Sequence, residues 1–376
     1  MKVRTRMNPE RSSARQRARS PERTPRAAVL RHKTGRETRR MKLERLVEYA
    51  RTHQHALVLT HDNPDPDSLA SAFALAHILE RLAGVDSVVA FGGIVGRAEN
   101  RALVRVLKLP VVPIAKVDFD EFDLICMVDT QPEQGNHSLP SRHFPDVVID
   151  HHPERPETKL APIADVGGTR GATSTLLAEY FRASGLEMTS QLATALYYGI
   201  KADTRNLARQ TTPEDVDAYL WLFPMVDKEA LVEIEHPRLP IDYFRLYHRA
   251  TERAQVWDQA VLCDLGEIYA PDMVAEVAER FGFLEDVRWS LAWGEYDDQL
   301  FYSIRTSDRR MNAGKLVREI IETRGGSAGG HGSMAGARLD LSDLGETGRR
   351  RLKSEIAEAF LREFGVKPSK KPRKIV

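Results

Sequence analysis

Short apolar runs alternate with amphipathic stretches along most of the chain. Four runs are apolar enough to be buried strands, at residues 55–61, 87–91, 123–130 and 146–152. Stretches with apolar residues three or four positions apart predict helices at 68–83, 97–107, 172–184, 190–201 and 213–223. Apolar strands separated by helices are typical of a parallel sheet with helices on both faces. We therefore predict a parallel-sheet α/β domain over residues 41–225.

The pattern breaks at 226–240, where charges and two prolines replace the apolar periodicity, so we predict a linker there. Beyond it, strands are expected at 260–266, 287–294 and 300–307, and helices at 241–256, 271–281, 313–323 and 346–364. Residues 241–366 should form a smaller α/β domain whose sheet is mostly antiparallel. The basic segment 367–376 is expected to be a solvated tail.

The net charge of +1 hides an uneven distribution. Residues 1–40 hold 14 basic and three acidic side chains, so the rest of the chain carries about −10. This extension is rich in arginine, serine and proline and has no apolar periodicity, which predicts disorder. Three interpretations stay open: an arm that contacts nucleic acid, a cleaved targeting peptide, or residues that the working protein lacks, with Met41 opening the ordered part.

The composition fits a globular protein without membrane spans. Hydrophobic residues make up 42% of the chain, and no run approaches the ~18 apolar residues that a span needs. Cys126 and Cys263 are the two cysteines, which disfavours a disulfide framework or a cysteine zinc site and favours a reducing compartment. We therefore expect a cytoplasmic protein.

Acidic and histidine side chains gather where the predicted strands end. The clusters are His61, Asp65 and Asp67 after the first strand, Asp129, then Asp150, His151 and His152, and finally Asp203 after a helix. The carboxyl edge of an open parallel sheet is where ligands bind. A single aspartate there is usually a helix cap or a turn former. Several carboxylates at one edge would repel one another, and this joint pattern predicts a bound multivalent cation.

Carboxylate and imidazole ligands without thiolates suit Mn²⁺, Mg²⁺, Fe²⁺ or Co²⁺ better than a structural zinc ion. Six candidate ligands are too many for one ion. Two ions about 3.5–4 Å apart that share a bridging carboxylate would use all of them. Such a pair activates a bridging water and clamps the oxygens of a phosphoryl group, so the predicted chemistry is phosphate ester hydrolysis.

Five short motifs occur in an order that resembles one known family. They are "HDNPDPD", "VDT", "DHHP", "ADT" and a distant "GGHGSMAG". Together they resemble the DHH phosphoesterase superfamily, named for a triplet that is Asp150, His151 and His152 here. The last motif resembles the accessory DHHA1 domain of the branch that contains RecJ-type exonucleases and nano-RNase/3′-phosphoadenosine 5′-phosphate phosphatases. The resemblance spans roughly residues 50–340.

The resemblance implies two metal sites that share Asp129. One site would be His61, Asp65 and Asp129, and the other would be Asp67, Asp129, His151 and Asp203. His152 would face the substrate phosphate and either give a proton to the leaving oxygen or stabilise the developing charge. Asp150 would orient an imidazole, as groups behind ligand histidines generally do.

The same resemblance implies a nucleotide-holding surface in the second domain. Backbone N–H groups at Gly329 and Gly330 would approach a phosphate, because glycine has no Cβ to block it. His331 would add a side-chain contact, and Arg305 would grip a phosphate through two hydrogen bonds. The active site would then lie in a cleft between the domains.

The chain departs from the family pattern in two places. Pro66 and Ser68 stand where a glycine and a small apolar residue are common. After Asp203 the chain reads "TRNL" instead of a glycine and an aromatic residue. We expect Arg205 to enter the cleft and to alter substrate choice.

The leading hypothesis is a metal-dependent phosphoesterase that degrades short oligonucleotides from one end, like a nano-RNase, and also acts on 3′-phosphoadenosine 5′-phosphate. Its cofactors would be two divalent ions, Mn²⁺ first, with Mg²⁺ or Co²⁺ as alternatives. Its partner would be a short oligonucleotide or nucleotide, because the acidic part of the chain beyond residue 40 would repel a long polyanion. The oligomeric state is open, with a homodimer among the options.

Three alternatives remain at this point. The first is a phosphodiesterase for cyclic or linear dinucleotides that uses the same metals. The second is an inorganic pyrophosphatase or exopolyphosphatase, although such proteins do not normally carry a "GGHGSMAG" motif. The third is a non-catalytic nucleotide- or nucleic-acid-binding protein, which the complete ligand set disfavours.

Overall fold

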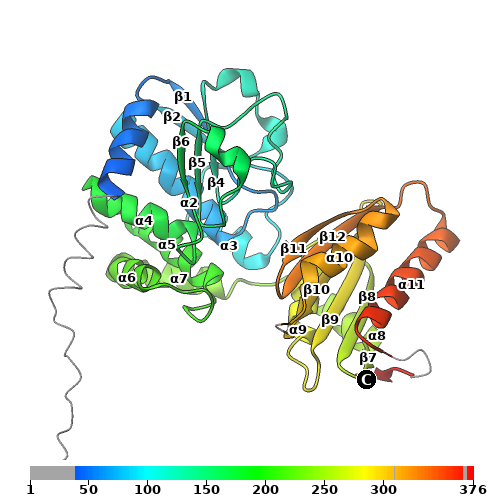
Figure 1. Ribbon diagram of the computed structural model, residues 1–376. Helices are drawn as coiled ribbons and strands as arrows, with labels where there is room; N and C mark the ends of the chain where they lie inside the picture. The colour runs from blue at the N-terminus through cyan, green and yellow to red at the C-terminus, as the bar shows by residue number, and fades with distance from the viewer. Residues whose placement is uncertain (1–38, 309, 367–370) are drawn as a thin grey trace, which may run out of the picture.

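The computed structural model describes residues 39–308, 310–366 and 371–376, which form two α/β domains (Figure 1). The first domain contains a six-stranded parallel sheet in the order β3-β2-β1-β4-β5-β6. Its strands are β1 (His55–Leu59), β2 (Asp86–Phe91), β3 (Val111–Pro113), β4 (Leu124–Val128), β5 (Val147–Asp150) and β6 (Ile163–Val166). The predicted extension 1–40 lies outside the described residues except for its last two positions.

Long helices cover one face of this sheet. They are residues 39–50, α2 (Pro66–Ile78), α3 (Ala98–Val106), α4 (Thr173–Ser184) and α5 (Ser190–Asp203). Val58 of β1 and Cys126 of β4 point to this face and pack in one core with Leu75 and Phe181 from the helices. α6 (Pro213–Leu222) packs outside α4 and α5. The opposite face is covered by short 3₁₀ turns and loops around Phe119.

The four predicted strands and the five predicted helices of this domain are present. The prediction missed β3 and β6, which are three and four residues long and too short to show a period. It also took 226–240 to be a linker, which is wrong for its first half. Asp227 caps α7 (Lys228–Glu235), and Leu231 and Ile234 of that helix are buried against the first domain. The two apolar positions are hidden among charges, which obscures the helical period.

The second domain has a seven-stranded sheet in the order β11-β12-β10-β9-β8-β7-β13. Its strands are β7 (Gln255–Trp257), β8 (Ala260–Glu267), β9 (Trp289–Tyr296), β10 (Gln299–Thr306), β11 (Ser327–His331), β12 (Met334–Asp340) and β13 (Arg373–Lys374). The β8–β9 pair is parallel and the other pairs are antiparallel, as expected for a mostly antiparallel sheet.

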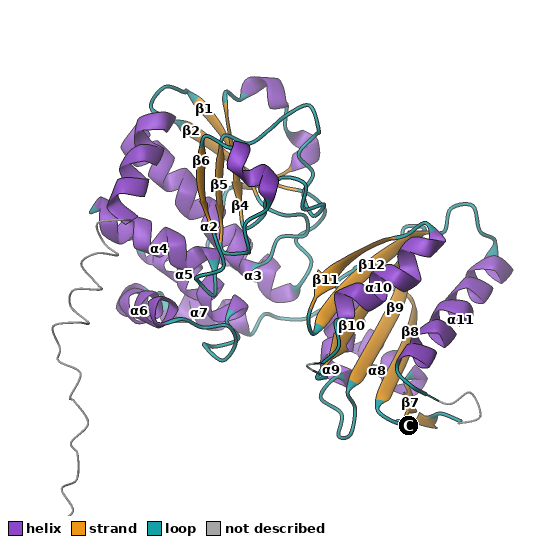
Figure 2. Cartoon of the chain, in the orientation of Figure 1, coloured by secondary structure: helices purple, strands orange, loops and turns teal. Residues whose placement is uncertain are grey.

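Helices cover both faces of this second sheet (Figure 2). α8 (Ile241–Arg253) and α9 (Met273–Phe281) pack on one face, with Leu246 and Val277 in their core. α10 (Ala313–Ile321) and α11 (Glu346–Glu363) pack on the other, around Tyr302 and Phe360. Each domain therefore buries its own apolar core.

Two further expectations for this domain need correction. The glycine-rich segment is not a loop, because Ser327–His331 pairs with Met334–Asp340 as an antiparallel hairpin. The C-terminal segment is not wholly a solvated tail, because Arg373 and Lys374 pair with the edge strand β7 while their side chains stay exposed. Neither segment has the alternating apolar pattern that marks a half-buried strand.

The two domains contact each other through α3 and α9. The guanidinium of Arg97 lies 3.1 Å from the carboxylate of Glu279. Gly96 packs so closely that a Cβ there would lie 1.3 Å from a carboxylate oxygen of Asp272, so a larger residue would require the Asp272 side chain to move. None of the described helices combines the length and the apolar character needed to cross a membrane.

Candidate metal centre

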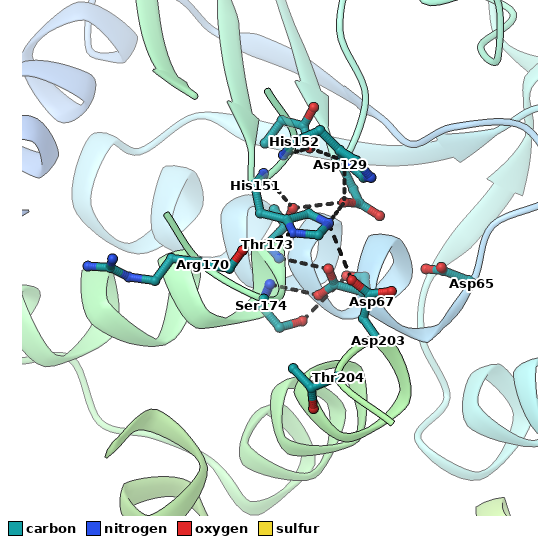
Figure 3. A network of polar contacts seen from close by, with 12 residues as sticks. Asp65, Asp67, Asp129, His151, His152, Arg170, Thr173, Ser174, Asp203 and Thr204 are labelled. Carbon is teal, nitrogen blue, oxygen red and sulfur yellow. Dashed lines mark hydrogen bonds and ion pairs between the residues drawn. The ribbon is translucent and has the colours of Figure 1, made fainter. Parts of the chain in front are cut away.

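The carboxyl edge of the first sheet collects the candidate ligands (Figure 3). His61 follows β1 and Asp129 follows β4, and these strands are neighbours at the point where the strand order reverses. In open parallel sheets, ligands bind at this switch point. Asp150 ends β5, with His151 directly after it. Asp203 reaches the same place from the end of α5.

His61, Asp65 and Asp129 form a first group whose ligand atoms all lie within 4.8 Å of one another. His61 Nε2 is 3.7 Å from Asp65 Oδ1 and 3.6 Å from Asp129 Oδ2. The other ring nitrogen, Nδ1, lies 2.9 Å from the backbone carbonyl of Asp62, which can only accept a hydrogen bond. Nδ1 therefore donates to that carbonyl, and Nε2 is the ring nitrogen that faces the two carboxylates.

Asp67, His151 and Asp203 form a second group with the same spacing. His151 Nε2 is 3.3 Å from Asp203 Oδ2 and 3.6 Å from Asp129 Oδ1. Its Nδ1 lies 3.3 Å from the carbonyl of Arg170, which again leaves Nε2 facing the carboxylates. The two oxygens of Asp129 thus face different groups, Oδ2 toward the first and Oδ1 toward the second.

Asp129 adopts a backbone conformation that residues other than glycine rarely adopt. Its φ is 58°, and its side chain is only 4% exposed. Its N–H donates to the carbonyl of Ile149 on the neighbouring strand at 3.0 Å. Such strain persists where the surrounding structure enforces it, and it concentrates at functional sites. The chain leaves β4 at this bend, with the carboxylate buried between the two groups.

Asp65 and Asp67 also cap helices. Asp65 is the N-cap of α2, and it forms a capping box with Ser68, whose N–H donates to Asp65 Oδ1 at 3.0 Å. Asp67 receives the backbone N–H groups of Thr173 and Ser174 at 2.7 Å each. These belong to the first turn of α4, whose own N-cap residue is an alanine. A helix N-terminus stabilises a negative charge, which partly offsets the burial and the charge of Asp65 that raise the pKa of Asp67.

His152 differs from the other two histidines in its orientation. Its Nδ1 lies 2.8 Å from Asp150 Oδ1, and its side chain is 35% exposed. The other oxygen of Asp150 accepts from the amide of Gln131 at 2.7 Å, so that fully buried carboxylate is fixed in place. Burial works against a charge on His152, but the bond to Asp150 and the charges of Asp129 and Asp150 raise its pKa above the usual value.

The centre holds more negative charge than the surrounding protein balances. Burial raises the pKa of Asp129 well above its usual range, and the charges of Asp67 and Asp65 raise it further. Burial and the same two neighbours raise the pKa of Asp203 to about 6. Burial opposes a charge on His61, but Asp65 and Asp129 outweigh it and raise its pKa to about 10. Carboxylate and imidazole groups are ligands that divalent cations bind. Such cations would balance the excess negative charge and replace the protons that the raised pKa values favour.

Comparison with known proteins assigns the family. Residues 55–200 match the model of the DHH family, N-terminal domain, and residues 258–358 match the DHHA1 domain. A curated protein from Methanocaldococcus jannaschii, described as an uncharacterized protein, is 33% identical over 339 residues, covering 88% of this chain and 68% of the relative. The chain belongs to the DHH/DHHA1 phosphoesterase family. The resemblance drawn from the five motifs is thereby confirmed.

More distant relatives agree with this fold. A probable manganese-dependent inorganic pyrophosphatase from Staphylococcus aureus is 26% identical over 162 residues, covering 43% of this chain and 52% of the relative. The crystal structure of an exopolyphosphatase-related protein from Bacteroides fragilis superposes with a TM-score of 0.66 at 14% identity, covering 86% of this chain and 98% of that chain. That likeness shows that the two-domain architecture is common to both proteins.

In this DHH/DHHA1 protein, the second domain places Arg305 beside the glycine-rich hairpin. Arg305 of β10 pairs with Met334 of β12, which in turn pairs with His331 of β11. The side chain of His331 lies outside the described part of the structure. The arginine's Nη1 donates to Ser303 Oγ at 2.8 Å. Within the described residues, no hydrogen bond or ion pair joins Arg305 to the six candidate ligands, so its substrate role stays a prediction.

Gly329 and Gly330 are exposed on the edge strand β11 and differ in their surroundings. Nothing lies within 4 Å of a Cβ built on Gly329, so the backbone there is open to a ligand. Gly330 has φ 133°, and a Cβ on it would lie 2.4 Å from Ala335 Cα. Glycine at 330 is therefore needed for the hairpin itself.

Thr173 is a site residue that the sequence did not reveal. Its hydroxyl donates to Asp129 Oδ1 at 2.8 Å and accepts from the backbone N–H of His151 at 3.2 Å. It is fully buried and opens α4. A threonine at a helix start is too common to signal such a contact, and its partners lie far away in the sequence.

Replacing Thr173 by valine should destabilise the metal-free protein. The substitution keeps the shape but leaves the buried N–H of His151 and one oxygen of Asp129 without their partner, which costs about 1–3 kcal/mol. Urea denaturation in the presence of a chelator would measure the free energy of unfolding. Thr173→Ser keeps the hydroxyl and should retain most of the stability. Equal losses in both variants would contradict the assigned hydrogen bonds.

Proposed function

We propose that this protein is a metal-dependent hydrolase of short oligonucleotides, nano-RNase-like, that also removes the 3′-phosphate of 3′-phosphoadenosine 5′-phosphate. The observation that carries the proposal is the position of Asp129 between two groups of candidate ligands, with Oδ2 facing His61 of the first group and Oδ1 facing His151 of the second. The DHHA1 domain, with Arg305 beside the hairpin, supports a nucleotide as the substrate. The proposed ligands are those of the two groups, and Mn²⁺ is the first choice of metal.

Two bound divalent ions would supply an activated water and a clamp on the oxygens of the attacked phosphate. The protein's own residues would supply the proton for the leaving oxygen. Asp150 holds the Nδ1 proton of His152, so Nε2 is the nitrogen left to meet the substrate. The raised pKa favours the protonated form of His152, which suits a donor of a proton to the leaving oxygen.

Metal content should distinguish Asp65 from Asp129. Asp65 belongs to the first group alone, whereas Asp129 belongs to the first group and its Oδ1 also lies 3.6 Å from His151 Nε2 of the second. The wild type should bind about two Mn²⁺ per chain, Asp65→Asn about one, and Asp129→Asn close to none, because only the shared carboxylate supports both ions. Elemental analysis after reloading with Mn²⁺ and desalting would give the ratios. Asp120→Asn, at a carboxylate whose side chain is 82% exposed, should bind as the wild type does. Identical losses in the Asp65 and Asp129 variants would argue against a bridge.

Loss of the His152 imidazole should slow the chemical step without emptying the metal centre. His152→Ala is expected to lower kcat by about 10²–10⁴-fold, the usual contribution of a general acid, while the Mn²⁺ content stays unchanged. His248→Ala removes a histidine that is 77% exposed on α8 and should change neither quantity. A fall in Mn²⁺ content in the His152 variant would make it a metal ligand instead.

A substrate panel tests the proposed activity directly. The panel consists of an RNA dinucleotide, a long single strand, 3′-phosphoadenosine 5′-phosphate, a cyclic dinucleotide and pyrophosphate, each with Mn²⁺ and with a chelator. We expect metal-dependent cleavage of the dinucleotide and of 3′-phosphoadenosine 5′-phosphate to exceed cleavage of the long strand. Processive digestion of the long strand with no action on the dinucleotide would reject the proposal.

The second candidate function is an inorganic pyrophosphatase. It is favoured by the match to the staphylococcal pyrophosphatase, which covers 43% of this chain. The DHHA1 domain counts against it, because a nucleotide-holding surface has no use in pyrophosphate hydrolysis. In the same panel, faster phosphate release from pyrophosphate than from any nucleotide would favour this candidate. Hydrolysis of the cyclic dinucleotide to its linear form would instead favour a cyclic-dinucleotide phosphodiesterase.

A further inference from the structure

The amide of Gln131 makes every hydrogen bond that a glutamine side chain can make. Gln131 lies in the chain that leaves β4, and it is fully buried. Its Nε2 donates to Asp150 Oδ2 at 2.7 Å and to the carbonyl of Pro153 at 3.1 Å. Its Oε1 accepts from the backbone N–H of Arg155 and from the hydroxyl of Thr158, both at 2.8 Å. Two N–H groups and two lone pairs are thus all used.

These partners leave the amide of Gln131 a single orientation. A carboxylate and a carbonyl can only accept, so the NH₂ group must face Asp150 and Pro153. The backbone N–H of Arg155 can only donate, so the oxygen must face it. A flipped amide would set its oxygen against two acceptors, and such unmatched buried groups are costly. Gln131 therefore presents an N–H to Asp150 and is itself held from the opposite side.

Asp150 passes this constraint on to His152. The carboxylate is fully buried, and its two oxygens have different partners. Oδ2 accepts from Gln131, whereas Oδ1 accepts from the backbone N–H of His152 at 3.1 Å and lies 2.8 Å from its Nδ1. Among the described residues, Asp150 is the one hydrogen-bond partner of the His152 ring. Fixing Oδ2 fixes the plane of the carboxylate, and with it the direction of the imidazole.

The contacts of Gln131 avoid the groups that would hold the ions. None of its four hydrogen-bond partners is one of the six candidate ligands. It is thus placed to influence the direction of His152 without a direct contact to either group of ligands.

We propose that Gln131 is a positioning residue that acts through Asp150 and directs Nε2 of His152 toward the leaving oxygen of the substrate. This role rests on the proposed function, in which His152 gives a proton to that oxygen. A displacement of about 1 Å in a reacting group can cost 10²-fold in rate. Gln131 would therefore act on the chemical step, and binding of the substrate and of the ions would not depend on it.

The plainer interpretation is that Gln131 only ties the segment 153–158 to the end of β4. Its loss would then lower the activity of any variant by the same factor, because the damage would be to the fold. If Gln131 instead acts through His152, its loss should matter only while the imidazole is present. The two interpretations therefore differ in a protein that lacks this ring.

The test compares four full-length, Mn²⁺-loaded proteins on the RNA dinucleotide: the wild type, Gln131→Met, His152→Ala and the double variant. The measured quantities are kcat, KM and Mn²⁺ content. Gln131→Met should lower kcat by about 10–100-fold and leave KM and Mn²⁺ content unchanged. In the His152→Ala background, the same substitution should change kcat by less than about twofold, since no ring remains to be positioned.

Thr194→Val is the matched control for lost stability. Thr194 is fully buried, and its hydroxyl donates to the carbonyl of Ser190 at 2.7 Å and accepts from the backbone N–H of Asp227 at 2.9 Å. The substitution also leaves buried polar groups without a partner, but it has no connection to Asp150. Thr194→Val should therefore lower the thermal unfolding temperature and keep the wild-type kcat.

Gln131→Asn provides a second variant in case Gln131→Met does not fold. It keeps a buried amide but is one methylene shorter, so it cannot span from Asp150 to Thr158. The same pattern is expected of it, with a fall in kcat that disappears in the His152→Ala background.

An equal fall in kcat with and without the imidazole would overturn the positioning role of Gln131. An unchanged kcat, or a loss of Mn²⁺, in the Gln131 variants would do the same. Each of these results leaves the hydrolase proposal intact. A wild-type protein that cleaves neither the dinucleotide nor 3′-phosphoadenosine 5′-phosphate would instead reject the proposed function itself.

Discussion

Mutual repulsion among buried carboxylates is the constraint around which the first domain is organised. Asp65, Asp67, Asp129 and Asp203 meet at one sheet edge, and the protein answers with helix N-termini, a threonine hydroxyl and three imidazoles. These groups fix each oxygen without neutralising the total charge. The fold thus holds the candidate ligands close together without a cation, and the free energy of folding sustains an arrangement that is unfavourable by itself.

The sequence predicted the part of this architecture that local patterns encode. Apolar runs marked β1, β4 and β5, and because their carboxyl ends share one edge, the sequence alone grouped the candidate ligands. What it missed depends on contacts between distant residues. Asp67 caps α4 from 106 positions away, and a donor such as Thr173 leaves no local signal. The roles of the grouped residues as metal ligands remain predictions.

The junction between the two domains, by contrast, collects arginine side chains. The metal centre concentrates acids, whereas arginines from α3, the turn 204–210 and β10 lie beyond Asp203. Arg97 and Arg205 both contact Glu279 of α9, so acids share this junction with the arginines. The departure from the family motif after Asp203, where a glycine is common, falls in this turn, where Arg205 has φ 48°, so the strained backbone and the added charge have one origin in the sequence.

The two edges of the second sheet are unlike. β13, from the end of the chain, pairs with β7 and satisfies the hydrogen-bonding groups of that strand. β11 at the opposite edge pairs on one side with β12, and it is rich in glycine. An unpaired edge strand can accept a strand from another chain, and short edge strands are one way in which proteins limit such pairing. The edge beyond β7 is a strand of two residues, Arg373–Lys374, with exposed basic side chains, so it offers an incoming strand less backbone than β11 does at the opposite edge.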